Sequence, residues 1–376
     1  MTQAQSTIPP KAEKFMARAL RLARKGLGRT DPNPMVGAVI VKRGRVVGEG
    51  FHRAPGKPHA EVEAIRDAGT RTQGSELYVT LEPCNHHGRT PPCTEVIRKS
   101  GISAVWFGMA DPNPGVKGGG AEALTRAGLQ VRGPVLEDRC KRLNEVYLTN
   151  VTLGRAFVFL KLGMSLDGRI ATRTGHSRWI TSEASRRQVH RLRDRVAGVM
   201  IGIGTALADN PSLTTRLPRG SGRDAERIIV DSSLRTPPDS KIMNPSSPAG
   251  VIIACRAKPP AQRRKRLEQA GARVLPTSGS KRVDLPDLLS QVYGLGITSI
   301  LIEGGSELAW GALNAKIVDR CLFYYAPIMI GGQDAPSGIS GTGIDKLEQA
   351  PRLTDVEVSR VGPDMLVSGR VSHQGS

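Results

Sequence analysis

The chain is poor in aromatic residues and in long apolar runs, and each shortage argues against a class of protein. Phe, Trp and Tyr make up 4% of the 376 residues, which is few for a protein that stacks nucleic-acid bases on aromatic rings. No apolar run approaches the length of a membrane span. Residues 1–10 are polar and lack the apolar core of a signal peptide.

Cysteine is also scarce, and its distribution argues against a disulfide framework. The number is odd and the spacings are irregular, so we expect a protein of the reducing cytoplasm. The five cysteines are Cys84, Cys93, Cys140, Cys255 and Cys321.

Acidic residues are outnumbered, since 54 Lys and Arg face 34 Asp and Glu, for a formal net charge of +20. A basic excess can indicate a nucleic-acid partner. The excess is spread over the chain, at +9 for residues 1–150 and +11 for the remainder, and is not packed into a tail. Basic surface also attracts small phosphorylated substrates and cofactors.

The length of the chain suits two globular domains, and strand and helix patterns alternate in both halves. We expect α/β domains over residues 1–153 and 154–376, with the boundary near Gly154. The expected helices cover residues 12–27, 60–68, 93–99, 121–127, 135–146, 183–193, 285–293 and 306–315. The expected strands cover residues 36–41, 46–50, 77–81, 104–109, 158–162, 198–203, 227–231, 250–254 and 299–302.

One histidine and two cysteines, His59, Cys84 and Cys93, form the strongest chemical pattern in the chain. A neutral imidazole and two thiolates occupy three corners of a tetrahedral zinc site and leave the fourth open for water. Glu61, two residues after the histidine, suits a carboxylate that moves protons beside the metal. This order, His-x-Glu followed by Pro-Cys and Cys, is typical of zinc-dependent deaminases.

Each part of this pattern has an ordinary alternative. A lone His-x-Glu usually lies on the surface, and two cysteines can be inert core thiols. A structural zinc site closes its fourth corner with a protein ligand, and His86 or His87 could supply one in a non-catalytic binding module. The occurrence of all the parts in one order favours the catalytic site.

The spacing of the two cysteines indicates which family of zinc-dependent deaminases the chain resembles. Eight residues separate Cys84 from Cys93, whereas base-editing and cytidine deaminases usually have two. The run 83–93, with DPNPMVG at 31–37 and DPNP at 111–114, resembles the deaminase half of the bifunctional deaminase–reductases of riboflavin biosynthesis. The resemblance implies a cytidine-deaminase-like domain with three α/β/α layers.

The second half has glycine-containing runs at 161–169, 202–214 and 303–306. Backbone N–H groups at such turns can hold phosphate, although most are only tight turns. The Gly-x-Gly-x-x-Gly fingerprint of a Rossmann fold is missing. The three glycine-containing runs, in this order and together with the runs at 177–181 and 326–332, resemble the reductase half of the same family. The resemblance implies a dihydrofolate-reductase-like α/β domain that uses NADPH.

The resemblance also implies roles at matching positions, although most arginines are solvated and many serines only cap turns. The implied NADPH site contains Met164, Trp179, Thr205, Asp209, Ser232 and the turn at Gly305. The implied reductase substrate site contains Ser177, Arg193, Leu213, Arg216 and Glu303, with Lys161 beside the same pocket. The implied deaminase substrate site contains Asn33, His52, Arg89, Asp111 and Asn113; at position 89 the family has Lys as often as Arg.

Two reactions on phosphorylated pyrimidines follow from the resemblance. Zinc-activated hydroxide would deaminate 2,5-diamino-6-ribosylamino-4(3H)-pyrimidinone 5′-phosphate. NADPH would then reduce the ribosyl to the ribityl chain, giving 5-amino-6-(5-phospho-D-ribitylamino)uracil. The expected partners are these small molecules, without nucleic acid or membrane, in a homo-oligomeric enzyme. The rival hypothesis is a nucleic-acid base deaminase with a non-catalytic C-terminal domain, which the basic charge favours.

Overall fold

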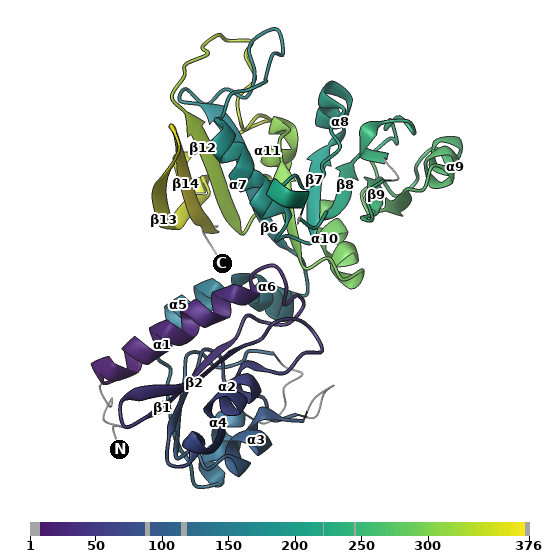
Figure 1. The fold of residues 1–376 in the computed structure, drawn as a ribbon. Coiled ribbons are helices and arrows are strands. Elements are labelled where there is room, and N and C mark those ends of the chain that lie inside the picture. The colour runs from purple at the N-terminus through teal and green to yellow at the C-terminus, as the bar shows by residue number, and fades with distance from the viewer. Residues whose placement is uncertain (1–7, 87–90, 114–118, 221, 244–245, 373–376) are drawn as a thin grey trace. The chain divides into compact units, whose positions relative to one another are not determined.

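The computed structural model describes residues 8–86, 91–113, 119–220, 222–243 and 246–372. The chain divides into two compact units, residues 1–154 and 155–376, which are described separately (Figure 1). None of the described helices is long and apolar enough to cross a membrane.

The first unit is built on a mixed sheet. Its strands are β1 (Gly37–Lys42), β2 (Arg45–Phe51), β3 (Glu76–Val79), β4 (Ala104–Phe107) and β5 (Gln130–Arg132), and their order is β2-β1-β3-β4-β5. β1 pairs antiparallel with β2 and β3, whereas β3, β4 and β5 run parallel. The described α-helices are α1 (Pro10–Ala23), α2 (Ala60–Ala68), α3 (Cys93–Lys99), α4 (Gly120–Arg126), α5 (Glu137–Leu143) and α6 (Glu145–Leu153).

Side chains along β1 alternate between two apolar layers, as expected for a strand covered on both faces. Val39 lies in the same buried cluster as Met16 of α1. Ile40 points to the other face, where it shares a cluster with Ala64 of α2. Helices therefore cover both faces of the sheet (Figure 1), and the predicted three-layer α/β/α arrangement is confirmed.

The second unit contains a sheet in the order β10-β9-β8-β7-β11-β6-β12-β14-β13. Its strands are β6 (Phe157–Ser165), β7 (Gly198–Gly202), β8 (Glu226–Val230), β9 (Val251–Cys255), β10 (Arg273–Pro276), β11 (Ser299–Glu303), β12 (Arg320–Ala326), β13 (Arg352–Val361) and β14 (Asp364–Ser372). The described α-helices are α7 (Glu183–Arg193), α8 (Ile203–Asp209), α9 (Ala261–Gln269), α10 (Leu285–Gly294) and α11 (Ser306–Asn314).

The strands from β10 to β12 in this sheet are parallel, and the antiparallel β13–β14 hairpin follows β12. β11 is central: Ile300 and Ile302 enter one buried cluster and Leu301 enters the other. The carboxyl ends of parallel strands meet at one edge, which is where ligands bind in open α/β sheets. The predicted α/β class of this domain is confirmed.

The prediction of one continuous helix over 135–146 is wrong. The structure has α5 and α6, separated at Asn144, whose φ is −107°. The Asn144 carboxamide accepts a hydrogen bond from the Met35 amide at 2.8 Å and donates to the Met35 carbonyl at 3.0 Å. This contact over 109 positions of sequence accompanies the break, and local periodicity carries no sign of it.

Candidate active sites

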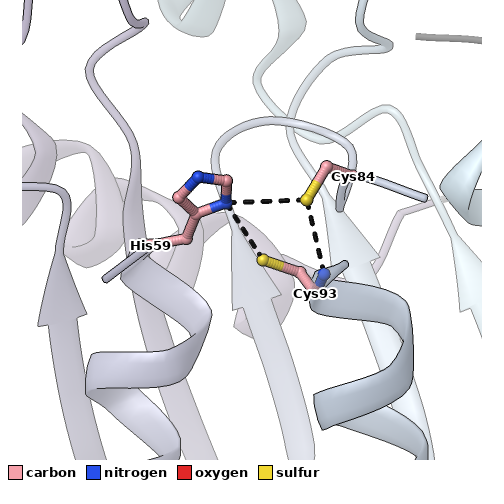
Figure 2. Close-up of side chains that lie close together, drawn as sticks. All are labelled: His59, Cys84 and Cys93. Atoms are coloured by element: carbon pink, nitrogen blue, oxygen red, sulfur yellow. Dashed lines mark hydrogen bonds between the residues drawn. The ribbon is translucent and has the colours of Figure 1, made fainter. Parts of the chain in front are cut away.

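His59, Cys84 and Cys93 converge in the first unit (Figure 2). His59 is the N-cap of α2, Cys84 follows β3, and Cys93 is the first residue of α3. His59 Nδ1 lies 3.2 Å from Cys93 Sγ and 3.5 Å from Cys84 Sγ. The three ligand atoms lie within 4.8 Å of one another. One imidazole nitrogen and two sulfurs fit zinc, which takes such N/S sets.

Close packing of α2 on β2 positions the histidine. A Cβ atom at Gly50 would lie 2.3 Å from the Ala60 carbonyl oxygen, so only glycine allows this approach. The first turn of α2 is thereby held against the sheet, with His59 at its start and Glu61 within it.

The thiols and the carboxylate of this site have perturbed pKa values. The Cys84 pKa is lowered, first by its hydrogen bond with the Cys93 thiol and also by His59, while the same bond raises the pKa of Cys93. Glu61 is 3% exposed, and burial raises its pKa to about 7. Such a carboxyl can exchange protons near neutral pH.

The fourth corner of the site has no protein ligand among the described residues, since only the three named side chains group there. His86 is exposed and stands outside the group. His87 lies outside the described residues. For the part of the chain that is described, the geometry is that of an open site.

His52, one of the residues predicted for the deaminase substrate, packs against the ligand His59 and contacts Asn33, a second such residue. His52 is buried, and its ring meets the His59 ring edge-on at 5.5 Å between centroids. His52 Nδ1 is 3.2 Å from the Pro58 carbonyl oxygen, which can only accept, so Nδ1 carries the proton. His52 Nε2 then accepts from the Asn33 amide group at 3.0 Å, which orients that carboxamide.

The other predicted deaminase residues are placed less directly. The Asp111 carboxylate accepts hydrogen bonds from the backbone N–H of Asn113 at 3.0 Å and from the Tyr147 hydroxyl at 2.8 Å. Glu82 accepts from the Asp111 amide at 3.4 Å. Tyr147 and Glu82 were not predicted. Glu82 could have been named as a site residue because it directly precedes Pro83-Cys84, whereas nothing in the sequence singles out Tyr147. Arg89 lies outside the described residues.

A cavity of about 1340 Å³ lies along the carboxyl edge of the second sheet. Its lining comes from β6, α7, β8, the β7–α8 and β11–α11 turns and the segment before α10. Every residue predicted for the reductase site lines this cavity except Met164. The Met164 side chain is 5% exposed and packs in the core.

An ion pair and a buried lysine occupy one part of this cavity. Arg193 donates to both carboxylate oxygens of Glu303, through Nε at 2.6 Å and Nη2 at 2.9 Å. Burial would raise the pKa of Glu303, but Arg193 outweighs it and the pKa is lowered. Burial lowers the pKa of Lys161, although the Glu303 charge opposes the change.

The β11–α11 turn offers a place for phosphate. Gly304 and Gly305 have φ values of 71° and 82°, in the left-handed region that favours glycine. A Cβ atom at Gly305 would lie 3.1 Å from Thr205 Oγ1, so the turn also passes close to α8. The free N–H groups at the start of α11 suit an anionic ligand.

Comparisons with known proteins identify a deaminase region and a reductase domain in the chain. The model of the RibD C-terminal domain matches residues 156–367, and the model of the cytidine and deoxycytidylate deaminase zinc-binding region matches residues 9–109. The chain belongs to the RibD family. It therefore combines a deaminase with a reductase of riboflavin biosynthesis, and the family's cofactors, Zn²⁺ and NADPH, are its cofactors.

RibD relatives cover almost the whole chain. The Bacillus amyloliquefaciens riboflavin biosynthesis protein RibD is 42% identical over 353 residues, which are 94% of each chain. Escherichia coli RibD is 39% identical over 364 residues, covering 94% of this chain and 97% of the relative. The Acinetobacter baumannii RibD structure, form 1, has a TM-score of 0.84 at 35% identity and covers 96% of this chain and 99% of its own. The deaminase/reductase structure from Thermotoga maritima gives 0.81 at 38% identity over the same shares.

Several residues of the RibD reductase cavity were not predicted. His190 of α7 lines it near the charges of Arg193 and Arg216, and the Arg186 guanidinium lies 4.4 Å from the Trp179 ring centroid. His190 had one usable signal, since it precedes Arg193 by three residues and thus shares its helix face. Arg186 had no signal beyond its charge.

Proposed function

We propose that the first domain deaminates 2,5-diamino-6-ribosylamino-4(3H)-pyrimidinone 5′-phosphate. The second domain would then reduce the ribosyl chain, giving 5-amino-6-(5-phospho-D-ribitylamino)uracil. The observation that carries the proposal is the convergence of His59, Cys84 and Cys93 beside the buried Glu61, in one chain with the reductase cavity. The proposed boundary is 1–153 and 154–376.

In the deaminase site, His59, Cys84 and Cys93 would hold zinc, which supplies water activated for attack near neutral pH. Glu61 would take the proton of the attacking water and give it to the ring nitrogen beside the attacked carbon. It would later pass a proton to the departing ammonia. Asn33, oriented by His52, would bind the pyrimidine. Arg89, Asp111 and Asn113 complete the proposed substrate contacts.

In the reductase site, the cavity would hold NADPH, which would supply the hydride for reduction at C1′ of the opened ribose. The start of α11 at Gly305 and the side chains of Thr205, Asp209, Ser232 and Trp179 would hold the cofactor. Met164 is proposed for the cofactor site from its motif position alone, since its side chain packs in the core and does not line the cavity.

The substrate side of the cavity is proposed to contain Ser177, Leu213, Arg216, Lys161 and the Arg193–Glu303 pair. Three N–H donors of Arg193 are already used, two on Glu303 and one on the Thr214 carbonyl oxygen at 3.0 Å. Arg216 is exposed, and among the described residues it has no ion-pair partner. We therefore assign the substrate phosphate mainly to Arg216, since guanidinium groups bind phosphate well.

The proposed partners are these small phosphorylated pyrimidines, without nucleic acid or membrane. We also propose a homo-oligomer. A cytoplasmic location is proposed as well, and the lack of disulfides among the five cysteines supports it.

Product analysis tests the proposed pathway. The full chain, loaded with zinc, is incubated with the diaminopyrimidine phosphate, with and without NADPH, and products are identified by mass spectrometry. Without NADPH we expect only the ribosylaminouracil phosphate, and with NADPH the ribitylaminouracil phosphate. Absence of deamination by zinc-loaded protein would overturn the proposal.

A further inference from the structure

His190 makes a directed contact within the reductase cavity. It lies on α7 and lines the cavity. The backbone N–H of Arg216 points at its Nδ1 atom, with a distance of 3.2 Å. A backbone N–H can only donate, so Nδ1 must be the acceptor and the proton of the neutral ring must be on Nε2.

The same helix holds the 214–216 segment at a second point. Arg193, one turn after His190, donates through Nη1 to the Thr214 carbonyl oxygen at 3.0 Å. Two side chains of α7 therefore hold two backbone groups of a segment that has no helix or strand of its own at these positions. The backbone is therefore held at residue 214 and at residue 216 itself, from which the Arg216 side chain extends.

The surroundings keep the His190 ring neutral. Burial lowers its pKa first, the positive charges of Arg193 and Arg216 lower it further, and Glu303 opposes them. The result is a pKa of about 4. The acceptor at Nδ1 is therefore present throughout the neutral range.

We propose that His190 is a positioning residue for the reduction, which through Nδ1 fixes the Arg216 backbone so that its guanidinium meets the substrate phosphate. This inference rests on the phosphate role proposed for Arg216. It assigns His190 no contact with the reacting atoms. The rate of hydride transfer should thus depend little on it, and substrate affinity should depend on it clearly.

Two amide substitutions distinguish this role from simple packing. In His190→Asn, Oδ1 can accept near the place of Nδ1, whereas in His190→Gln the oxygen lies nearer the place of Nε2. KM and kcat are measured with the deaminated ribosylaminouracil phosphate at saturating NADPH, and the Kd of NADPH is measured by fluorescence as a control for folding.

We expect His190→Gln to raise KM about fivefold, the effect of about one hydrogen bond, with little change in kcat. His190→Asn should restore KM to within about twofold of the parent, within the scatter of such bonds. The Kd of NADPH should stay unchanged in both variants. Equal KM values for the two variants would overturn the inference, because loss of packing affects them alike.

Arg216→Ala separates this inference from the proposed function. If Arg216→Ala raises KM and His190→Gln does not, the positioning role is wrong and the phosphate role stands. If Arg216→Ala leaves KM unchanged, the phosphate role is wrong and the inference is wrong with it. In the Arg216→Ala background, we expect His190→Gln to raise KM no further, as coupled residues are not additive.

Discussion

Arg193 in the last turn of α7 and Glu303 at the end of β11 form a bidentate ion pair whose side chains are 12% and 10% exposed. This pair joins a helix to the central strand of the reductase sheet, 110 positions apart in sequence. Lys161 lies on β6, the neighbour of β11, and adds a second positive charge near Glu303.

Removal of Arg193 should destabilise the protein strongly. Arg193→Met leaves the Glu303 carboxylate buried without its main partner, at a cost of roughly 3 kcal/mol. Chemical denaturation of the full chain measures the loss. The matched control is Arg187→Met on the same helix, where the pair with Glu183 is exposed and is worth less than about 1 kcal/mol. Equal losses in the two variants would contradict a stabilising role of the buried ion pair.

Substitution of the zinc-binding cysteines should have a different effect from substitution of the other cysteines. We expect about one zinc per chain by metal analysis. Cys84→Ser or Cys93→Ser should lose the metal and deamination together, because the alcohol is a poor zinc ligand. Cys140→Ser, at a buried thiol outside the ligand group, should keep both. Zinc-free protein with full deaminase activity would refute the assignment.

Glu61 should be needed for the chemistry and dispensable for the metal. Glu61→Gln keeps the shape but cannot carry the proton, so we expect deamination to fall by roughly 10²–10⁴-fold. Glu63→Gln, on the same helix, should keep activity, since Glu63 pairs with the exposed Arg53 and Arg66 and lies outside the ligand group. The measurement is steady-state deamination with zinc content determined in parallel. Near-parent activity of zinc-loaded Glu61→Gln would show that another group moves the proton.

His190 should titrate well below an ordinary histidine. Its pKa in the folded protein is about 4, against about 6.5 in the unfolded chain. Protonation therefore favours unfolding: the stability from the neutral ring is complete above about pH 6.5 and is lost as pH falls toward 4. NMR of the histidine ring protons as a function of pH measures the pKa of His190. The His190 resonance is assigned as the one that is missing in His190→Asn. A midpoint near 6.5 would contradict the burial argument.

The parts predicted from sequence are those with local signals. Helix α2 and the ligand order around His59 follow from short-range patterns, and both appear where predicted. Strands β12, β13 and β14 were not predicted. β13 is largely exposed and has no clear alternation, and its place depends on pairing with β14.

The site residues also divide into those with a signal in the sequence and those whose contacts arise only on folding. Arg193 and Glu303 could both be named from the family resemblance, but their pairing with each other, across 110 positions of sequence, is fixed only by folding. The acceptor role of His190 depends on a backbone amide 26 positions away. Met164 shows a limit of motif positions, because a motif position does not reveal that the side chain packs in the core.

The chain carries two sites, which we infer to work independently of each other. The most direct test supplies zinc-loaded Glu61→Gln with ribosylaminouracil phosphate and NADPH, and follows NADPH oxidation. In parallel, Asp209→Ala and Arg216→Ala receive the diaminopyrimidine phosphate. We expect a parent-like rate of reduction in Glu61→Gln, and accumulation of the deaminated intermediate in the other two variants. Loss of reduction in folded, zinc-loaded Glu61→Gln would contradict the independence of the two sites.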